Sequence, residues 1–387
     1  MAMDTLDIAR VLVGFNTVSE HSNLALIHWI RDYLGGLGVA SRLSYNADRT
    51  KANLFATLGA GKPDGLILSG HTDTVPWTGQ PWTVDPLGAL VRDDRLYGRG
   101  SADMKGFIAA CLAHAPRFLQ SDAPHAIHLA FSYDEEVGCF GVRELIADMR
   151  GAGIRPVGCV VGEPTGMVPA IAHKGVYRWR CCVRGKPGHS SLTPQLVNAV
   201  DYAARMAVKI QGMAERWERE ETRYPGFDVP WSTACVAQFH GGTADNIVPQ
   251  DAELRYEFRN LPTADVAAMQ AEVERHAAEL TQRMRAVAPE TGIRFETICE
   301  DPAFLTTPGA PLTRLAQAWA SEERTTLVAF GTEAGLFTGA GIPCIVCGPG
   351  HIAQAHQPDE FVELEQLARC DAFLQALGQA RALPGLS

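Results

Sequence analysis

Short apolar runs alternate with helical segments in the first part of the chain, and this alternation constrains the fold more than any other feature. The runs LILSG (66–70), AIHLAFS (126–132) and CVVGEP (159–164) have the length of buried strands. Segments 106–119 and 142–150 have the apolar spacing of helices. Strands that alternate with helices are typical of a parallel sheet covered by helices. We therefore predict an α/β fold with a mixed, mostly parallel sheet flanked by helices.

A different pattern occupies residues 176–302. Its order is strand, long helix, two strands, long helix and strand, which is typical of a small two-layer α+β domain. After residue 302 the α/β pattern returns, with the strand-like run IPCIVCG and a final helix from Leu364. We predict that residues 1–175 and 303–387 form one metal-binding catalytic domain, into which the smaller domain is inserted.

Charge and composition restrict the partners of the chain. A net charge of −10 argues against nucleic acid or an anionic membrane, because both attract basic surfaces. No run approaches the ~18 apolar residues of a membrane-spanning helix. The first residues, MAMDTLDIAR, have no basic segment before an apolar core, as a secretory signal would. We expect a soluble protein of the cytoplasm.

The ten cysteines are scattered through apolar segments, which is typical of buried thiols in a cytosolic protein. Cys344 and Cys347 have CxxC spacing, but the sequence lacks the second pair that a zinc ribbon needs. Residues three apart in a strand also point to opposite faces. We favour a structural role for this pair over a redox role.

Carboxylate and imidazole residues recur where the predicted strands end. In open α/β sheets, ligands bind beyond the carboxyl ends of the strands. Each residue has an ordinary explanation when taken singly, since an aspartate before a helix usually caps it and a glutamate pair usually lies in a solvated loop. Turn chemistry does not easily explain them together: His71, Asp73, Asp103, Glu135, Glu136, Glu163 and His356.

The types of these residues indicate a metal site. Two histidines with several carboxylates and no converging thiols suit zinc, cobalt or manganese. The set exceeds the ligands of one tetrahedral ion, so it indicates two metals that share a bridging carboxylate.

The segments SGHTDTVP, YGRGSADMKG, DEEVG, GEPT and AHQPDE resemble, in this order, the motifs of the dinuclear zinc exopeptidases and deacylases. The resemblance extends over nearly the whole chain, including the inserted domain. It implies two divalent metal ions, with Zn²⁺ preferred and Co²⁺ as the alternative. One ion would be held by His71 and Glu163 and the other by Glu136 and His356, with Asp103 bridging both.

The resemblance also implies the catalytic residues around the metals. Asp73 would be hydrogen-bonded to the far nitrogen of His71 and would fix its tautomer. The metals would lower the pKa of a bridging water, and Glu135 would carry its proton to the departing amine. His189, in the inserted domain, would stabilise the tetrahedral oxyanion, often in the active site of the partner subunit.

Three further residues match or neighbour family positions that contact substrate. Asn246 and Arg259 match such positions, and the arginine fork suits the α-carboxylate of an amino acid. The alternatives are that Asn246 stabilises a turn and that Arg259 pairs with Glu257. The segment FGTEAGLF (330–337) is most similar to family members that deacetylate N2-acetyl-L-ornithine, where Glu333 would face the ammonium group of ornithine.

The resemblance therefore implies a metal-dependent amidohydrolase that gives L-ornithine and acetate in arginine biosynthesis, and a homodimer that associates through the inserted domain. A deacylase, desuccinylase or dipeptidase for another N-acyl amino acid is the alternative in the same class. A non-catalytic binding protein on the same scaffold is the alternative from another class. It is disfavoured because the base and all five ligand positions are filled.

Overall fold

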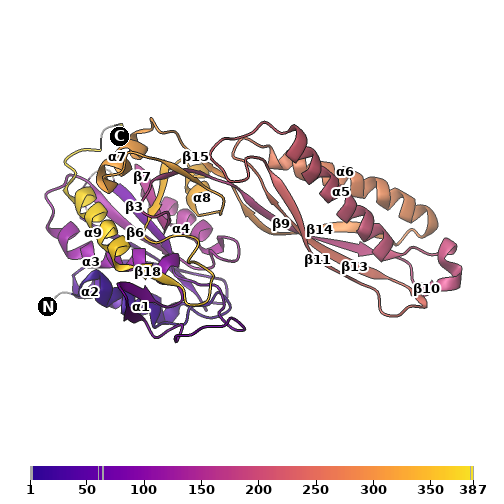
Figure 1. Ribbon diagram of the computed structural model, residues 1–387, viewed down its shortest axis with the longest axis horizontal. Helices are drawn as coiled ribbons and strands as arrows, with labels where there is room; N and C mark the ends of the chain where they lie inside the picture. The colour runs from indigo at the N-terminus through magenta and orange to yellow at the C-terminus, as the bar shows by residue number, and fades with distance from the viewer. Residues whose placement is uncertain (1–2, 60, 63–64, 384, 387) are drawn as a thin grey trace. The chain divides into compact units, whose positions relative to one another are not determined.

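The computed structural model describes residues 3–59, 61–62, 65–383 and 385–386 (Figure 1). The chain forms two compact units. The first contains Met1–Ala172, Phe304–Val328 and Thr332–Ser387, and the second contains His173–Ala303 and Ala329–Gly331. The second unit is therefore an insertion in the sequence of the first. Residues 173–175, 303 and 329–331 also belong to it, although the sequence predicts all of them in the catalytic domain.

A mixed nine-stranded sheet forms the centre of the first unit. Its four middle strands, in the order β6, β3, β7 and β17, run parallel, while β1–β2, β2–β6 and β17–β8 are antiparallel pairs. This arrangement confirms the predicted fold class. The strands are β1 (Ser41–Tyr45), β2 (Ala52–Leu58), β3 (Gly65–His71), β6 (Ala126–Ser132), β7 (Gly158–Pro164), β8 (Ala170–His173), β15 (Phe304–Leu305), β16 (Thr326–Val328) and β17 (Cys344–Gly348).

Helices flank this sheet, which explains why its middle strands are apolar without alternation. Every residue of β3, β6 and β7 is buried, as expected for strands covered on both faces. The largest core cluster joins the sheet to α1, α3 and α9 through side chains such as Leu12, Phe107 and Phe373. The helices are α1 (Thr5–Val13), α2 (Leu24–Gly36), α3 (Gly106–Gln120), α4 (Phe140–Gly151), α7 (Pro311–Ala320), α8 (Ala334–Gly339) and α9 (Leu364–Gln379).

A small antiparallel sheet in the first unit joins two loops that are far apart in sequence. It consists of β4 (Leu90–Arg92), β5 (Arg95–Tyr97) and β18 (Phe361–Glu363). Tyr97 pairs with Phe361. The loop that follows β5 therefore starts beside the loop that precedes β18.

The second unit is a two-layer α+β structure. Its antiparallel sheet has the order β11 (Thr233–Gly241), β13 (Asp251–Arg259), β9 (Val176–Arg184) and β14 (Gly292–Asp301). Along β13, buried Leu254, Tyr256 and Phe258 alternate with charged residues, so one face of the sheet packs on helices and the other is charged. The helices are α5 (Ala199–Glu220) and α6 (Val266–Val287).

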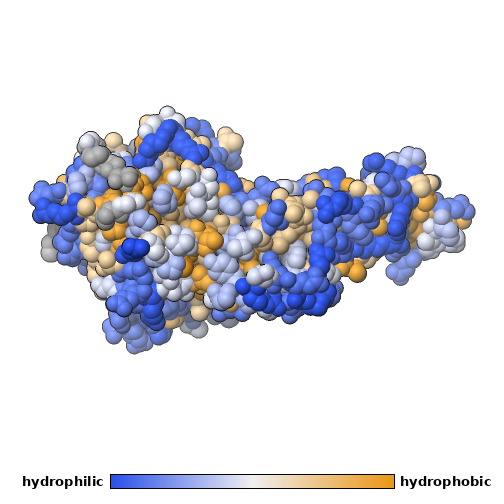
Figure 2. Space-filling view, turned by 90° about the horizontal axis from the view of Figure 1, so that it is seen from above, coloured by the Kyte–Doolittle hydropathy of each residue, from blue (hydrophilic) through white to orange (hydrophobic). Residues whose placement is uncertain are grey.

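The helices of the second unit begin and pack as their sequences predict. The side chain of Asn198 caps α5 and that of Asp265 caps α6, each by accepting main-chain N–H groups of the first turn. Most of this unit's surface that is visible in Figure 2 is hydrophilic, as expected for helices whose apolar residues face a sheet. Among the described residues, we find no helix with the length and hydropathy that a bilayer crossing requires.

Candidate metal centre

The parallel strands of the first unit bring four predicted site residues to one edge of the sheet. β3 ends at His71, which lies opposite Ser132 at the end of β6. Glu135 and Glu136 follow β6 directly, and Glu163 lies near the end of neighbouring β7. Because parallel strands end at the same edge, their acidic and imidazole residues converge there.

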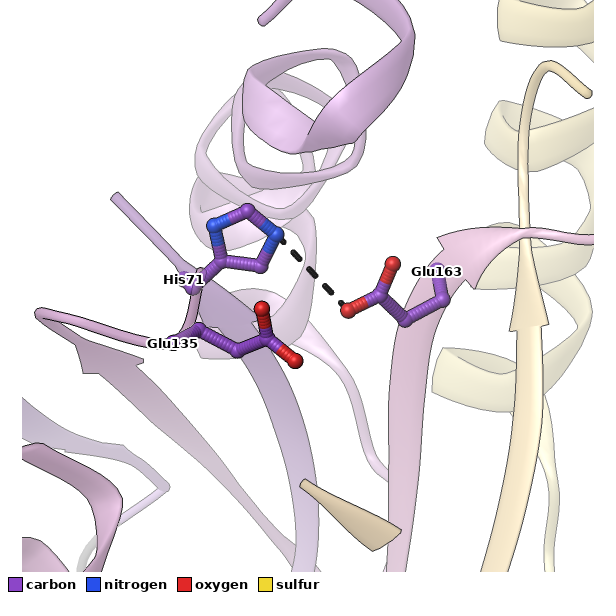
Figure 3. A group of neighbouring side chains, drawn as sticks. All are labelled: His71, Glu135 and Glu163. Atoms are coloured by element: carbon purple, nitrogen blue, oxygen red, sulfur yellow. Dashed lines mark ion pairs between the residues drawn. The ribbon is translucent and has the colours of Figure 1, made fainter. Parts of the chain in front are cut away.

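Asp103 lies between the two histidines. His71 Nε2 is 2.9 Å from Asp103 Oδ1, and His356 Nε2 is 3.2 Å from Asp103 Oδ2. His356 Nε2 is also 3.0 Å from Glu136 Oε2, and His71 Nε2 is 3.7 Å from Glu163 Oε1 (Figure 3). The two oxygens of one carboxylate thus face two different imidazoles, each of which has a second carboxylate beside it.

Among the described residues, ligand atoms gather in two sets of three residues each. Within each set, the atoms lie within 4.8 Å of one another. One set comes from His71, Glu135 and Glu163 (Figure 3), and the other from His71, Asp103 and Glu136. Glu135, the predicted base, therefore has an oxygen within 4.8 Å of ligand atoms of His71 and Glu163.

The turn after β3 holds His71 in one tautomer. His71 Nδ1 is 3.0 Å from the main-chain oxygen of Asp73, whereas the nearest carboxylate oxygen of Asp73 is 3.6 Å away. A nitrogen that donates to a carbonyl must carry the proton, which leaves Nε2, the nitrogen that faces Asp103, as the one that would bind a metal ion. His71 Nδ1 thus contacts both the main chain of Asp73, by a hydrogen bond, and its carboxylate, which was the predicted partner, by a longer ion pair.

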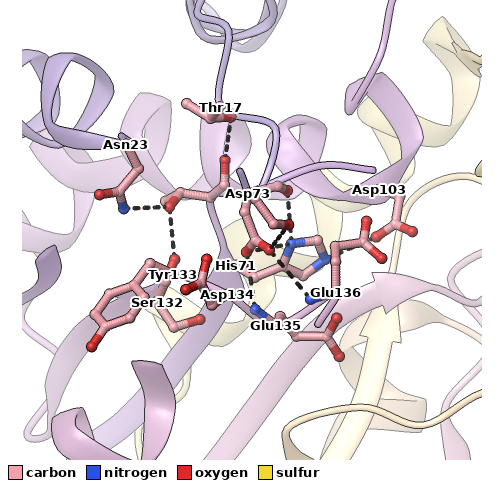
Figure 4. A network of polar contacts seen from close by, with 12 residues as sticks. Thr17, Asn23, His71, Asp73, Asp103, Ser132, Tyr133, Asp134, Glu135 and Glu136 are labelled. Atoms are coloured by element: carbon pink, nitrogen blue, oxygen red, sulfur yellow. Dashed lines mark hydrogen bonds and ion pairs between the residues drawn. The ribbon is translucent and has the colours of Figure 1, made fainter. Parts of the chain in front are cut away.

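The Asp73 carboxylate instead organises the turn that carries the two glutamates (Figure 4). Its Oδ1 accepts the N–H of Glu135 at 3.1 Å, and its Oδ2 accepts the N–H of Glu136 at 3.3 Å and the hydroxyl of Ser19 at 2.7 Å. Asp73 is buried, and these donors satisfy its charge. It therefore acts on Glu135 and Glu136 through their main chain.

Further hydrogen bonds hold Thr72, which lies between His71 and Asp73 (Figure 4). The Thr72 carbonyl accepts the Thr17 hydroxyl at 2.6 Å, and Asn23 donates to Thr72 Oγ1 at 2.8 Å. Thr72 in turn donates its hydroxyl to the carbonyl of Ser132 at 2.7 Å, which ties the ends of β3 and β6 together.

Burial and crowding shift the pKa values of the cluster. Burial, with the charge of Glu163 second, raises the pKa of Glu135 well above its ordinary value. Burial also opposes ionisation of Asp103, but hydrogen bonds with His356 and His71 hold its pKa below the usual range. Hydrogen bonds to Asp103 and Glu136 raise the pKa of His356 to about 10. A buried site that stabilises positive charge so strongly between two nitrogens and several oxygens fits divalent cations.

Glu333 occupies a different place from the one predicted for it. It is 1% exposed, and its carboxylate accepts the hydroxyl of Ser69 at 2.9 Å and that of Ser132. Ser69 and Ser132 lie in β3 and β6, so the buried carboxylate contacts the ends of these two strands, beside His71. This burial argues against the predicted contact with a substrate ammonium group.

The predicted residues of the second unit do not form one cluster. His189 and Asn246 are neighbours, because β10 (Gly188–His189) pairs with β12 (Ile247–Val248) and Ser190 N–H donates to the Asn246 carbonyl. Arg259 lies at the other end of β13, where its Nε donates to Glu257 at 3.1 Å. The alternative pairing weighed for Arg259 is thus present in the structure.

Sequence reasoning assigned no role to Glu360, which is buried beside the Asp103 loop. The available signal was its position at the end of AHQPDE, four residues after His356.

Residues 67–380 match the model of peptidase family M20/M25/M40. The chain belongs to this family. It is 34% identical over 388 residues to an acetylornithine deacetylase from Myxococcus xanthus, covering 96% of this chain and 97% of that protein.

Solved structures share the fold. An M20 family metallo-carboxypeptidase from Sulfolobus solfataricus matches with a TM-score of 0.77 at 15% identity, covering 97% of this chain and 99% of that one. A dinuclear metal binding M20 peptidase from Bacillus subtilis matches with a TM-score of 0.66 at 15% identity, covering 97% and 96%. With its family and its cluster of ligand groups, the chain is a metal-dependent hydrolase of amide bonds.

Proposed function

We propose that this M20 hydrolase removes the acetyl group from N2-acetyl-L-ornithine to give L-ornithine and acetate, as a step of arginine biosynthesis. Similarity to proteins named acetylornithine deacetylase, such as those from Myxococcus xanthus and Proteus mirabilis, supports the substrate. The observation that carries the reaction class is Asp103, whose two oxygens face two imidazoles inside a buried cluster of carboxylates.

The proposed site holds two divalent ions, Zn²⁺ in preference to Co²⁺. His71 and Glu163 would hold one ion, Glu136 and His356 the other, and Asp103 would be shared. When bound, the pair supplies Lewis acidity, which lowers the pKa of a bound water and polarises the amide carbonyl.

Glu135 is the proposed general base. Its main chain is held by Asp73, and its carboxylate oxygen Oε1 accepts from the Cys139 thiol at 3.6 Å. Burial raises its pKa, which suits a group that must take a proton from water and then give it to the departing amine. Asp73 fixes the position of the Glu135 main chain, while the carboxylate remains available to take up and release a proton.

His189 is the proposed donor to the oxyanion, acting in the partner subunit's site of a homodimer. Its Nδ1 accepts the N–H of Ser191 at 3.3 Å and lies 2.8 Å from the Ser191 hydroxyl. Because Nδ1 is an acceptor, the proton resides on Nε2, and this exposed residue can donate outward. Asn246 and Arg259 are proposed substrate contacts, and for Arg259 this role requires it to leave Glu257.

Hydrolysis assays with the purified protein test the proposal. The substrates are N2-acetyl-L-ornithine, N-acetyl-L-methionine, N-succinyl-diaminopimelate and a dipeptide, each before chelation, after chelation and after Zn²⁺ or Co²⁺ is restored. We expect metal-dependent turnover with acetylornithine preferred. Metal-dependent turnover of another substrate alone would keep the mechanism and replace the substrate, whereas turnover that survives complete chelation would refute the metal mechanism.

A further inference from the structure

Glu360 is a buried carboxylate that is bonded to the loop of Asp103. It is 1% exposed. Its Oε1 accepts three main-chain N–H groups, from Gly100 at 3.0 Å, Ala102 at 3.0 Å and Asp103 at 3.2 Å. One carboxylate oxygen thus gathers the N–H groups of the loop that carries the shared carboxylate of the metal centre.

The other oxygen of Glu360 starts a path to His356. Glu360 Oε2 accepts from Arg99 Nη1 at 2.7 Å, and Arg99 Nη2 donates to Gln80 Oε1 at 2.6 Å. Gln80 Nε2 then donates to the carbonyl oxygen of His356 at 2.9 Å. We call Glu360, Arg99 and Gln80 the Glu360 strap. It joins the main chain of Asp103 to the main chain of His356.

The surroundings of the strap keep it in place. Arg99 is 1% exposed, and its guanidinium lies 5.1 Å from the ring centroid of Trp82. Trp82 also donates its indole N–H to Gln80 Oε1 at 3.0 Å. In this buried ion pair each carboxylate oxygen of Glu360 has at least one donor and both Nη atoms of Arg99 donate, whereas Arg99 Nε has no hydrogen-bond partner among the described residues. The charges are therefore retained in a geometry that is specific to these two loops.

The turn at His356 needs such support. His356 has a positive φ of 62°, which is costly for a residue other than glycine, and its side chain is 47% exposed. Little side-chain packing therefore fixes its imidazole, although this ring must face both Asp103 and Glu136. The hydrogen bond from Gln80 to its carbonyl supplies a fixed point at the residue itself.

We propose that Glu360 is a positioning residue. Through Arg99 and Gln80 it holds Asp103 and His356 at the separation that the binding of two metal ions requires. This inference rests on the proposed metal-dependent hydrolysis. Glu360 acts through the main chain, because its hydrogen bonds go to N–H groups of the Asp103 loop and to the side chain of Arg99. If Asp103 or His356 is displaced, we expect a lower affinity for the ion that both residues would bind. Loss of groups that orient metal ligands lowers metal affinity in the same way.

The test measures metal affinity apart from activity. Dissociation constants for Zn²⁺ and Co²⁺ are determined by competition with a chromophoric chelator, and the visible spectrum of the Co²⁺ protein reports ligand geometry. Glu360→Gln keeps the side chain's size but removes the charge that pairs with Arg99, and we expect roughly 10- to 100-fold weaker binding of at least one ion with an altered spectrum.

A second variant remains informative if Glu360→Gln does not fold. In Gln80→Glu the partly exposed side chain still accepts from Arg99 but no longer donates to the His356 carbonyl. We expect a smaller loss of metal affinity and an altered Co²⁺ spectrum at unchanged thermal stability. Glu363→Gln, which removes a carboxylate of β18 that pairs with Arg95 at the surface, is the matched control and should bind both ions as the parent does.

The outcomes separate the strap from the function. If the parent protein binds no pair of divalent ions and hydrolyses no acyl amino acid, the proposed function fails first. If the parent binds them and folded Glu360→Gln or Gln80→Glu binds them with the same affinity and spectrum, the strap proposal alone is overturned. A lower melting temperature with unchanged affinity would likewise reduce Glu360 to a purely structural residue.

Discussion

The candidate residues of the first unit and those of the second differ in how the chain holds them. In the first unit, segments from β3, β6, β7 and two loops place their charged groups in one cluster, whose members are buried or partly buried except for His356, which is 47% exposed. In the second, His189 and Asn246 are exposed at one end of β13, and Arg259 is paired with Glu257 at the other. β13 has nine residues, so these ends are roughly 25 Å apart at about 3.3 Å per residue.

The two sets of residues differ in the free-energy cost of their positions, and therefore in what those positions imply. A buried cluster of like charges is costly unless cations or protons compensate it, so its existence points to a ligand. Exposed polar residues carry no such cost and are compatible with an empty surface. These three residues do not form a site together, and the roles proposed for them require a bound substrate or a partner subunit.

Loss of the shared carboxylate should have the largest effect. Asp103→Asn removes the charge that faces both imidazoles, and we expect kcat/KM to fall about a thousandfold or more, because metal catalysis contributes several kcal/mol. Bound metal, measured by elemental analysis after dialysis, should fall below two ions per chain. Asp251→Asn, at a surface ion pair of the second unit, is the control. Full activity and full metal content in Asp103→Asn would contradict the centre described here.

Glu135 sharpens the comparison within the cluster, because its carboxylate lies within 4.8 Å of a ring nitrogen of His71. If it is the base, Glu135→Gln should lower kcat by about 10²- to 10⁴-fold while both ions remain bound. The same dialysis and elemental analysis decides the point. Loss of an ion comparable to that in Asp103→Asn would show that Glu135 is a ligand.

His189 tests whether the second unit contributes to catalysis at all. We expect His189→Ala to lower kcat by about 10²- to 10³-fold, as loss of an oxyanion donor does, with metal content unchanged. Mixing His189→Ala chains with Glu135→Gln chains should restore activity if a histidine from one subunit completes the site of another, because a mixed dimer has one intact site. No recovery from a mixture shown to contain mixed dimers would place His189 in its own subunit's site or outside catalysis.

The fold and the membership of the cluster could be predicted because both depend on local signals. Apolar runs such as 66–70 and 126–132 predict buried strands, and the parallel arrangement then brings the residues after them to one edge. The orientation of each side chain could not be predicted in this way. Asp73 contacts Glu135 and Glu136 through hydrogen bonds that span more than 60 residues.

Residues that act through the main chain of distant loops are invisible to motif reasoning for the same reason. Glu360 bonds to N–H groups some 260 positions away, which any residue type presents. The acid in AHQPDE was visible, but its role depends on the pairing of β5 with β18. The ligands can be recognised from the chemistry of their side chains in the sequence. The residues that hold the ligands in place can be recognised only from the tertiary structure.

The smallest expected effect belongs to Glu333, where burial opposes the substrate role inferred from sequence. The Ser69 and Ser132 hydroxyls can each donate or accept, so the amide of Glu333→Gln can still bond to both. We expect the free energy of unfolding to change by about 1 kcal/mol or less. The ratio of kcat/KM for acetylornithine to that for N-acetyl-L-methionine should stay the same, because a carboxylate inside the packing does not face the substrate. A selective loss of acetylornithine turnover would instead show that Glu333 reaches the ammonium group. Glu333 would then be a substrate-binding residue and not a residue of the buried packing.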